Sequence, residues 1–376
     1  MDAGIMAYRH ILLKEIYEQP RAVMDTLRER IEDTDRLLDE LGIGHGVNNL
    51  RRLHIVGNGA SYHAGLVGRY IIEKFVRIPV NVDLSSEYQY MNPNITKGTY
   101  FIALSQSGET PDTIGAQREA RKKGALVFSV CNVAGSASAR EADSVLYTYA
   151  GREKGATSTK GFSAQLAALC LLGIALGVKK GTLHKIEVET LKALIMTLPA
   201  LISEVLRNDT KIRDIAGTLA NSGGVIYLGR GINYPIAREG ALKMKELSFI
   251  HAEGYAIGQL NFGHSKVVGR DAPVVFLSPI ESIDDRMLND IAKVKAVGGR
   301  VIVITDSPAS ISGMADHLII VPSIHPALLP FVTVVPLQLL AYHVADVKGC
   351  DMDRPGAAAE TEMDAYGVHA SDGAFR

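Results

Sequence analysis

Short apolar runs alternate with longer stretches of helical character along most of the chain. The runs of the first series read as buried strands, and they are RLHIVGNGAS, VNVDLSS, TYFIALSQSG, ALVFSVCN and SVLYTYAG. The intervals between them leave room for helices. Strands that alternate with helices predict a parallel sheet in a layered α/β domain.

A second series follows a helical stretch from about residue 163 to residue 206, and its runs are GVIYLGRG, PVVFLSP, RVIVITD and HLIIVPS. The two series resemble each other. Residues 55–74 can be laid against residues 227–246, since both read as a strand, a Gly-x-Gly pair and a helix. About fifty residues further on, ALSQSGETPDT faces FLSPIESIDDR, so we infer an internal duplication.

The Gly-x-Gly pairs of the two series do not indicate a dinucleotide site. The full G-x-G-x-x-G spacing is missing after both Gly57 and Gly229. We expect these glycines to let the backbone approach a ligand, or another segment of backbone, closely.

Length and composition agree with two domains. The chain has 376 residues, 47% of them hydrophobic, and this is enough for two sizeable cores. We expect a helical segment at 1–45, a first α/β domain at 46–206, a second at 207–355 and a tail at 356–376.

Charge and residue usage exclude several classes of function. A formal net charge of −1 and the absence of Trp argue against nucleic acid or a membrane surface as the main partner. The three cysteines are scattered, with no spacing typical of a metal site, so we expect no metal and a reducing, cytoplasmic location. The longest apolar segment, residues 162–178, is predicted to be a buried helix rather than a membrane span.

Hydroxyl side chains cluster at one predicted strand-to-helix turn. Ser105, Ser107 and Thr110 follow the run TYFIAL, and Pro111 and Asp112 predict the start of a helix. Free N–H groups and the dipole at a helix start favour an anion. Hydroxyls without a Walker lysine suit a phosphate monoester better than a nucleoside triphosphate. An ordinary polar capping turn is the alternative, but it would need only one of these hydroxyls.

The corresponding turn of the second series has lost this cluster. Pro279 and Ile280 stand where the first series has Gln106 and Ser107. Because the hydroxyls are missing from the second copy, we expect a single phosphate pocket, and we expect it in the first domain.

The second series carries charged residues in a predicted helix instead. The segment 238–255 should form the helix that follows GVIYLGRG and run on into a further segment. Glu239, Lys243 and Glu246 lie at i, i+4 and i+7, which puts two carboxylates and an ammonium on one helix face. A solvated face with salt bridges is one interpretation. A ligand site is the other, because the helix begins where α/β sheets bind ligands.

Several long motifs, in order, resemble one family, and they are GNGASYHAG, SQSGET, GATSTKGFSAQL, LGRGINYPIAREGALKMKELSFIHAEGY and VPLQLLAYHVADVKGCDMDRP. They resemble glutamine:fructose-6-phosphate aminotransferase, also called glucosamine-6-phosphate synthase, and specifically its isomerase half. The resemblance covers residues 8–355. It implies an α/β fold of two tandem flavodoxin-like SIS (sugar isomerase) domains, each a parallel sheet between helices, and a homodimer. It also implies that the glutaminase domain of the family is not in this chain.

The resemblance further implies roles for individual residues. The residues that match phosphate contacts are Ser61, Ser105, Gln106, Ser107 and Thr110. Ser158 matches a residue near the sugar, and we group Glu239 with it. Lys243 and Glu246 match the helix lysine and the general base that moves a proton between C1 and C2.

Two segments depart from the family. Where the family usually has GELKHGPLAL, residues 258–268 read GQLNFGHSKVV, with Gln259 at the position of the Glu and Phe262 at that of the ring-opening histidine. His264, two residues further on, is the candidate substitute acid. In the tail, Glu360 stands where the family has a lysine that forms a Schiff base, and a carboxylate cannot form an imine.

We therefore expect a phosphosugar enzyme without a cofactor. Its reaction would be the isomerisation or amination of a hexose 6-phosphate through an enediol or enolamine, with Glu246 as base. Ammonia would be free or would come from a separate glutaminase. One alternative is an amino-sugar phosphate deaminase or a fructosamine-phosphate deglycase, whose substrate brings its own nitrogen. The other is a non-catalytic phosphosugar sensor, which has no need of a base.

Overall fold

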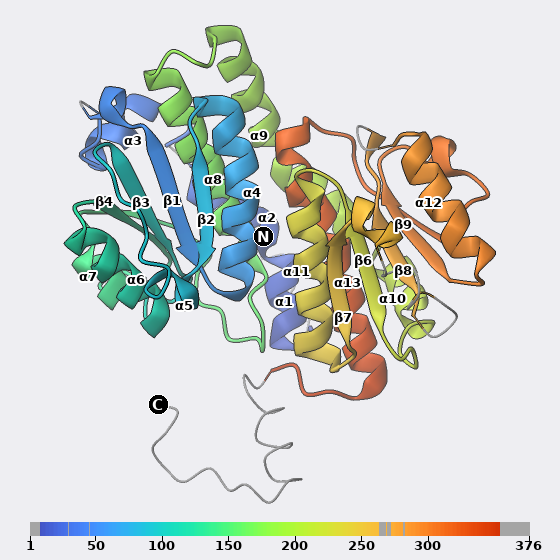
Figure 1. The fold of residues 1–376 in the computed structure, drawn as a ribbon. Coiled ribbons are helices and arrows are strands. Elements are labelled where there is room, and N and C mark those ends of the chain that lie inside the picture. Colours follow the sequence, from blue (N-terminus) through green and yellow to red (C-terminus); the bar gives the residue numbers. More distant parts are fainter. Residues whose placement is uncertain are drawn as a thin grey trace, which may run out of the picture.

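Two parallel sheets form the frame of the protein in a computed structural model that describes residues 8–28, 30–44, 46–262, 268, 272–280 and 283–353 (Figure 1). The first sheet has the order β2-β1-β3-β4-β5, and its strands are β1 (Arg52–Gly57), β2 (Val80–Leu84), β3 (Thr99–Leu104), β4 (Leu126–Cys131) and β5 (Ser144–Tyr147). This is the flavodoxin-like order that was expected. The helices of this half are α4 (Gly59–Val76), α5 (Ser85–Tyr88), α6 (Pro111–Lys122), α7 (Ala137–Glu141) and α8 (Lys160–Lys179).

The second sheet repeats the first. Its order is β10-β9-β8-β6-β7, and its strands are β6 (Val225–Gly229), β7 (Ala252–Ala256), β8 (Val274–Leu277), β9 (Val301–Thr305) and β10 (His317–Ile320). Read from the other end, this is the connectivity of the first sheet, which agrees with a duplication. The helices around it are α10 (Asp209–Gly217), α11 (Asn233–Ser248), α12 (Asp285–Ala296) and α13 (Leu329–Lys348).

The strand β7 was not predicted. The sequence suggested that the helix of residues 238–255 continues into a further segment, but α11 ends at Ser248. Phe249 takes a left-handed conformation with φ 56°, which stops the helix. The chain then returns as β7, which pairs in parallel with β6. The short, mixed pattern of AEGYA gave no clear strand signal.

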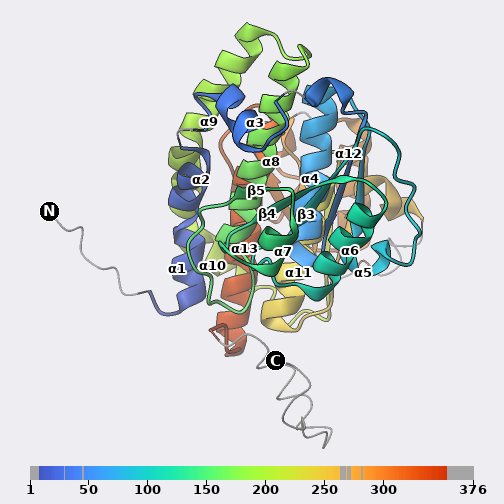
Figure 2. The ribbon, with the colours of Figure 1, turned by 90° about the vertical axis from the view of Figure 1, so that its left-hand side faces the viewer.

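Helices from both ends of the chain join the two halves. The segments α1 (Ile11–Tyr17) and α2 (Gln19–Leu27) run along one side of the molecule, where α1 packs on α13 and α2 packs on α8 and on α9 (Lys185–Leu206) (Figure 2). The helix α3 (Thr34–Glu40) packs on α8. Between the sheets, α4 of the first half lies against α11 of the second (Figure 1).

Two long apolar helices form the centre of the core. The helices at 160–179 and 326–348 are long and apolar enough to cross a membrane, but 94% and 100% of their apolar windows are buried inside the protein. The first contains the segment that was predicted to be a buried helix. The predicted helical stretch from 163 to 206 is in fact two helices, α8 and α9, which a turn at 180–184 separates.

The first glycine of each Gly-x-Gly pair is required by close backbone packing. A Cβ on Gly57 would lie 2.9 Å from the backbone of Ser61, and one on Gly229 would lie 2.2 Å from the carbonyl oxygen of Asn233. In both halves the helix therefore turns back directly against the end of the strand. This confirms the expected approach of one backbone segment to another.

We predict that Gly229→Ala destabilises the protein by about 1–3 kcal/mol, because the added methyl group overlaps backbone that cannot move aside. Gly217→Ala is the matched control, since a Cβ there meets no atom within 4 Å. Thermal unfolding of the two variants checks this. Equal melting temperatures would contradict the packing argument.

Candidate functional site

The loop between β3 and α6 wraps around the beginning of a helix. The Ser105 hydroxyl lies 2.9 Å from Thr110 Oγ1 and accepts a hydrogen bond from Gly108 N at 3.0 Å. Ser107 Oγ accepts from Glu109 N at 3.1 Å. Gly108 has φ 67°, and a Cβ there would lie 2.1 Å from Ser136 Oγ, so only glycine fits. The predicted hydroxyl cluster is therefore gathered in one compact turn.

The first turn of α6 has no side-chain cap. Thr110 is its N-cap residue, but the Thr110 side chain makes no capping hydrogen bond because it contacts Ser105 instead. The N–H groups of the first turn therefore point outward without a side-chain acceptor from the N-cap residue. Asn58, in the turn between β1 and α4, donates a hydrogen bond from its side chain to that of Asp112 at 3.3 Å, so this turn lies beside the beginning of α6. Ser61 belongs to this turn, and its Oγ accepts from Gln165 Nε2 at 2.9 Å.

The corresponding turn of the second half is occupied by a protein carboxylate. Asp284 caps α12 and accepts a hydrogen bond from Met287 N at 2.8 Å. Arg230 binds the other oxygen of this carboxylate at 2.6 Å. The hydrogen bond from Met287 and then the Arg230 contact hold the pKa of Asp284 below its usual range. A side chain of the protein thus takes the place that a ligand anion would occupy, which fits a single phosphate pocket in the first half.

The three charged residues of α11 form a buried ion-pair chain rather than a solvated face. Lys243 Nζ lies 3.3 Å from Glu239 Oε1 and 2.7 Å from Glu246 Oε2. The side chains of Glu239 and Lys243 are 0% and 1% exposed, whereas that of Glu246 is 38% exposed. Burial favours a neutral Lys243, but the charges of Glu239 and Glu246 outweigh it and raise the pKa of Lys243. Of the two carboxylates in this row of ion pairs, only that of Glu246 can therefore be reached by solvent or a ligand.

The first half supplies a partner for the inner carboxylate. His63, on α4, donates from Nδ1 to Glu239 Oε2 at 2.7 Å, and both side chains are buried. Since Glu239 has no exposed surface in this structure, it contacts Lys243 and His63 rather than facing a ligand. Glu239 thus holds Lys243 in place from its buried side. From the sequence, Glu239 was expected near the sugar, but a direct contact with a sugar would require the side chains around Glu239 to move apart.

The segment of residues 151–161, a loop followed by the first two residues of α8, contacts both the β3–α6 loop and α11. Thr157 Oγ1 accepts a hydrogen bond from Lys243 Nζ and donates one to Glu246 Oε2. At the other end of the loop, a Cβ on Gly161 would lie 3.0 Å from Gln106 Cγ. One short segment therefore contacts both predicted parts of the site.

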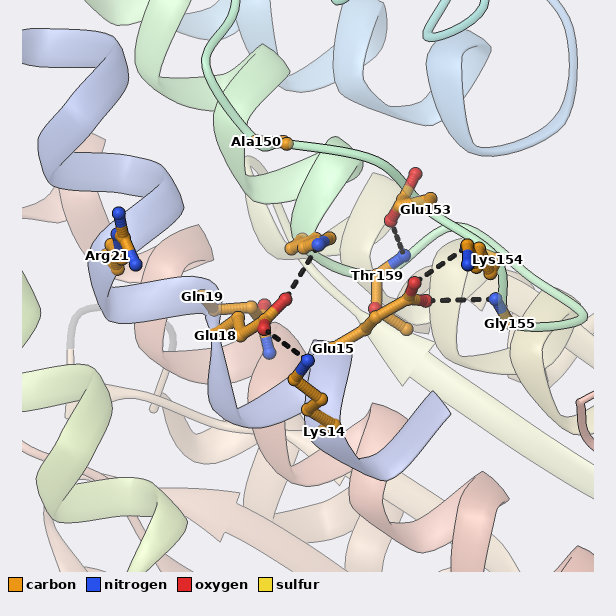
Figure 3. A network of polar contacts seen from close by, with 12 residues as sticks. Lys14, Glu15, Glu18, Gln19, Arg21, Ala150, Glu153, Lys154, Gly155 and Thr159 are labelled. Atoms are coloured by element: carbon orange, nitrogen blue, oxygen red, sulfur yellow. Dashed lines mark hydrogen bonds and ion pairs between the residues drawn. The ribbon is translucent and has the colours of Figure 1, made fainter. Parts of the chain in front are cut away.

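Carboxylates hold this loop in shape. Glu153 accepts from Ser158 Oγ at 3.0 Å, from Thr159 N at 2.8 Å and from Gly161 N at 2.9 Å. Glu15, on α1, points toward the loop and accepts from the backbone N–H groups of residues 154 and 155 at 2.6 and 3.1 Å (Figure 3). The N-terminal helix thus fixes the segment that carries Ser158 and Thr157.

A cavity of about 1200 Å³ lies beside Gln106 of the β3–α6 loop. It is bounded by α1, α2 and the segments that follow β4 and β5, and its lining includes Gln106, Glu153 and Lys160. Lys160 Nζ pairs with Glu18 of the N-terminal segment at 2.7 Å. Glu246 is not among the described residues that line this cavity.

The sequence reasoning found some of these residues and missed others. It selected Ser158 in GATSTKG but not its neighbour Thr157, which contacts Glu246. It also missed Glu15 and His63, although His63 lies in the motif GNGASYHAG. The departures are only partly described, since Phe262 is 77% exposed after the short helix of Ile257–Asn261, while His264 and Glu360 lie outside the described residues.

Within the described parts of the chain, no group of three His, Cys, Asp or Glu side chains is placed to hold a metal ion. The cysteines at 131, 170 and 350 are free thiols, and the first two are buried.

The geometry agrees with comparison to known families. The family model for the SIS domain matches residues 47–175 and 218–347, so this chain belongs to the SIS-domain family. It is 35% identical to the structure of the C-terminal domain of glucosamine-fructose-6-phosphate aminotransferase from Francisella tularensis, with a TM-score of 0.88. The match covers 94% of this chain and 100% of that domain.

Longer relatives support the same family assignment. The chain is 44% identical to the isomerizing glutamine–fructose-6-phosphate aminotransferase of Clostridium acetobutylicum and 42% identical to that of Caldanaerobacter subterraneus. Each match covers 94% of this chain but 59% of the relative. The chain thus spans about three fifths of the length of the curated relatives it matches, and the resemblance to the isomerase half is confirmed.

We predict that Glu239→Gln lowers the free energy of unfolding by about 3–5 kcal/mol at pH 7, because it leaves a buried ammonium short of a partner. Burial alone would raise the pKa of Glu239, but Lys243 and then His63 outweigh it and hold the pKa below its ordinary value of 4.5. The stabilisation is therefore complete above that value and is lost as the pH falls through the folded-state pKa.

Urea unfolding at several pH values measures this effect. The deficit of Glu239→Gln should be largest near neutral pH. It should begin to shrink below pH 4.5 and should disappear once the pH has fallen through the lowered folded-state pKa, where the wild-type carboxyl is also neutral. The exposed Glu204 provides the matched control Glu204→Gln, which should change stability by less than about 0.5 kcal/mol. A deficit that is independent of pH would contradict the ion-pair account.

Proposed function

We propose that this chain is a phosphosugar-processing enzyme related to the isomerase half of glutamine–fructose-6-phosphate aminotransferase. Its reaction is the aldose–ketose isomerisation or amination of a hexose 6-phosphate through an enediol or enolamine. The single observation that carries the proposal is the half-exposed carboxylate of Glu246. One oxygen of this carboxylate is held by Lys243 and Thr157, while the other has no partner among the described residues.

This arrangement suits proton transfer between neighbouring carbons. A carboxylate can take a proton from C1 or C2 and return it to the other carbon, provided that it stays beside both. The phosphate would bind at Ser105, Gln106, Ser107 and Thr110, with Ser61 beside it. Ser158, in the loop between the two parts, would contact the sugar. A phosphate fixed at one end would hold the C1–C2 unit of an extended hexose at the other.

The nitrogen source and the assembly are part of the proposal. For amination, ammonia would come from solution or from a separate glutaminase subunit. A homodimer in the cytoplasm is the expected setting. The names of the relatives support the amination, because those enzymes are called isomerizing glutamine–fructose-6-phosphate aminotransferases.

A second candidate function is favoured by one residue of the tail. Glu360 stands where the family has its imine-forming lysine, and it cannot replace that group. An amino-sugar phosphate deaminase or a fructosamine-phosphate deglycase would act on a substrate that already carries nitrogen, so it would not need the lysine.

The proposed base is tested by Glu246→Gln. Proton NMR in deuterated water follows the exchange of deuterium into C1 or C2 of fructose 6-phosphate and of glucosamine 6-phosphate, with and without ammonia. We expect exchange with the wild type and a loss of at least about 100-fold in the variant, because the amide cannot accept the proton. Glu204→Gln should behave like the wild type.

The sugar that exchanges also decides between the two functions. Exchange of fructose 6-phosphate supports isomerisation or amination, and exchange of glucosamine 6-phosphate alone supports the deaminase. If both sugars raise the melting temperature but neither exchanges, the chain is a phosphosugar sensor and the proposed catalysis is wrong.

We also predict that Thr110→Val raises KM for the phosphosugar by about 10–100-fold, because one hydrogen bond to a charged phosphate is lost. The kcat value should change little, since the phosphate is bound equally in the ground state and the transition state. Thr190→Val, on an exposed turn of α9, is the control. A fall in kcat with KM unchanged would argue against a phosphate contact.

A further inference from the structure

We propose that Thr157 is the positioning residue that orients Glu246 for proton transfer across the boundary between the two halves. This inference rests on the proposed function, since it concerns the same carboxylate. Thr157 lies in the motif GATSTKGFSAQL, but the resemblance gave it no role, and its side chain is nearly buried, with 7% of the residue exposed.

The hydrogen bonds of Thr157 can be assigned in only one way. An ammonium has protons to give and no lone pair, so Lys243 Nζ must donate to Thr157 Oγ1. The Thr157 hydroxyl has one proton of its own, and the ionised Glu246 can only accept. The hydroxyl must therefore donate that proton to Glu246 Oε2. The direction of this short chain is fixed by the chemistry of its members.

The consequence is an asymmetric carboxylate. Glu246 Oε2 receives two donors, Lys243 Nζ at 2.7 Å and Thr157 Oγ1. Rotation of the carboxylate about its last bond would break both contacts. Oε1 therefore stays turned away from the pair, and it is the oxygen that can take a proton from a substrate carbon. Lys243 alone would leave this rotation less restricted, because one contact does not define a plane.

The position of the Thr157 hydroxyl is set by contacts from outside α11. Thr157 lies in the loop that Glu153 and Glu15 hold from the side of α8 and α1. The Ala156 N–H just before it donates to Met352 O at 3.0 Å. The same loop touches Gln106 of the phosphate loop through Gly161. Thr157 thus relates the orientation of the base to the place where the phosphate would bind.

A purely structural role would not require this geometry. A hydroxyl needed only to satisfy Lys243 could stand anywhere around the ammonium. Thr157 instead bridges the buried ammonium and the carboxylate that is 38% exposed. The neighbouring Thr159 makes the contrast, because its hydroxyl is also buried in this loop but has no hydrogen-bond partner among the described residues.

The test compares Thr157→Val, Thr157→Ser and Thr159→Val in the deuterium-exchange assay. We expect Thr157→Val to lower kcat about 10–100-fold with KM within about twofold, because a hydrogen bond to a charged group is lost and no substrate contact is. Thr157→Ser keeps the hydroxyl and should restore kcat to within about threefold of the wild type. Thr159→Val, the matched control, should resemble the wild type in both constants.

Three results would overturn the inference: an unchanged kcat in Thr157→Val, a loss confined to KM, or a serine variant as slow as the valine variant. Crystal structures of the two Thr157 variants provide a readout that needs no activity. Glu246 should take a single conformation in the serine variant and more than one in the valine variant, and a single unchanged conformation in both would sink the proposal. If the wild type exchanges no sugar, the proposed function fails, and these crystal structures still decide the role of Thr157.

Discussion

The buried ammonium of Lys243 is the constraint on which the rest of the site depends. Removing such a charge from water costs several kcal/mol unless close partners compensate for it. Glu239 and Glu246 on the same helix supply the opposite charge, and His63 on α4 completes the inner carboxylate. His63 comes from the first half, and the two glutamates come from the second. The interactions that neutralise Lys243 therefore also fix the contact between α4 and α11.

The two duplicated halves carry different functional groups at equivalent positions. The corresponding strand-to-helix turn has no side-chain cap at the helix start in the first half and is capped by Asp284 in the second. The helix after the first strand carries His63 in the first half and the Glu239–Lys243–Glu246 chain in the second. If the first turn binds phosphate and Glu246 is the base, as proposed, the two groups lie on opposite sides of one boundary, which suits an extended phosphosugar.

Much of this could be predicted from the sequence, for physical reasons that differ between features. Alternating strands and helices and the hydroxyl cluster are local patterns, and the structure has both. The strand at 252–256 was missed because it is short and follows a helix that ends without a Gly or Pro. His63, Thr157 and Glu15 were missed because their partners are distant in sequence, and no local pattern reports such contacts. Helix spacing identified Glu239. Such spacing shows on which face of the helix a residue lies, but not how deeply its side chain is buried.

The central claim is that one phosphosugar spans the two halves, with its phosphate at the start of α6 and its C1–C2 unit at Glu246. The most direct measurement is a crystal structure with a hexitol 6-phosphate, which keeps the phosphate and cannot react. The account predicts phosphate oxygens within hydrogen-bond distance of Ser105, Ser107 and Thr110, and C1 or C2 about 3 Å from Glu246 Oε1. A phosphate bound in the cavity beside α1 and α2, or at the beginning of α12, would contradict it.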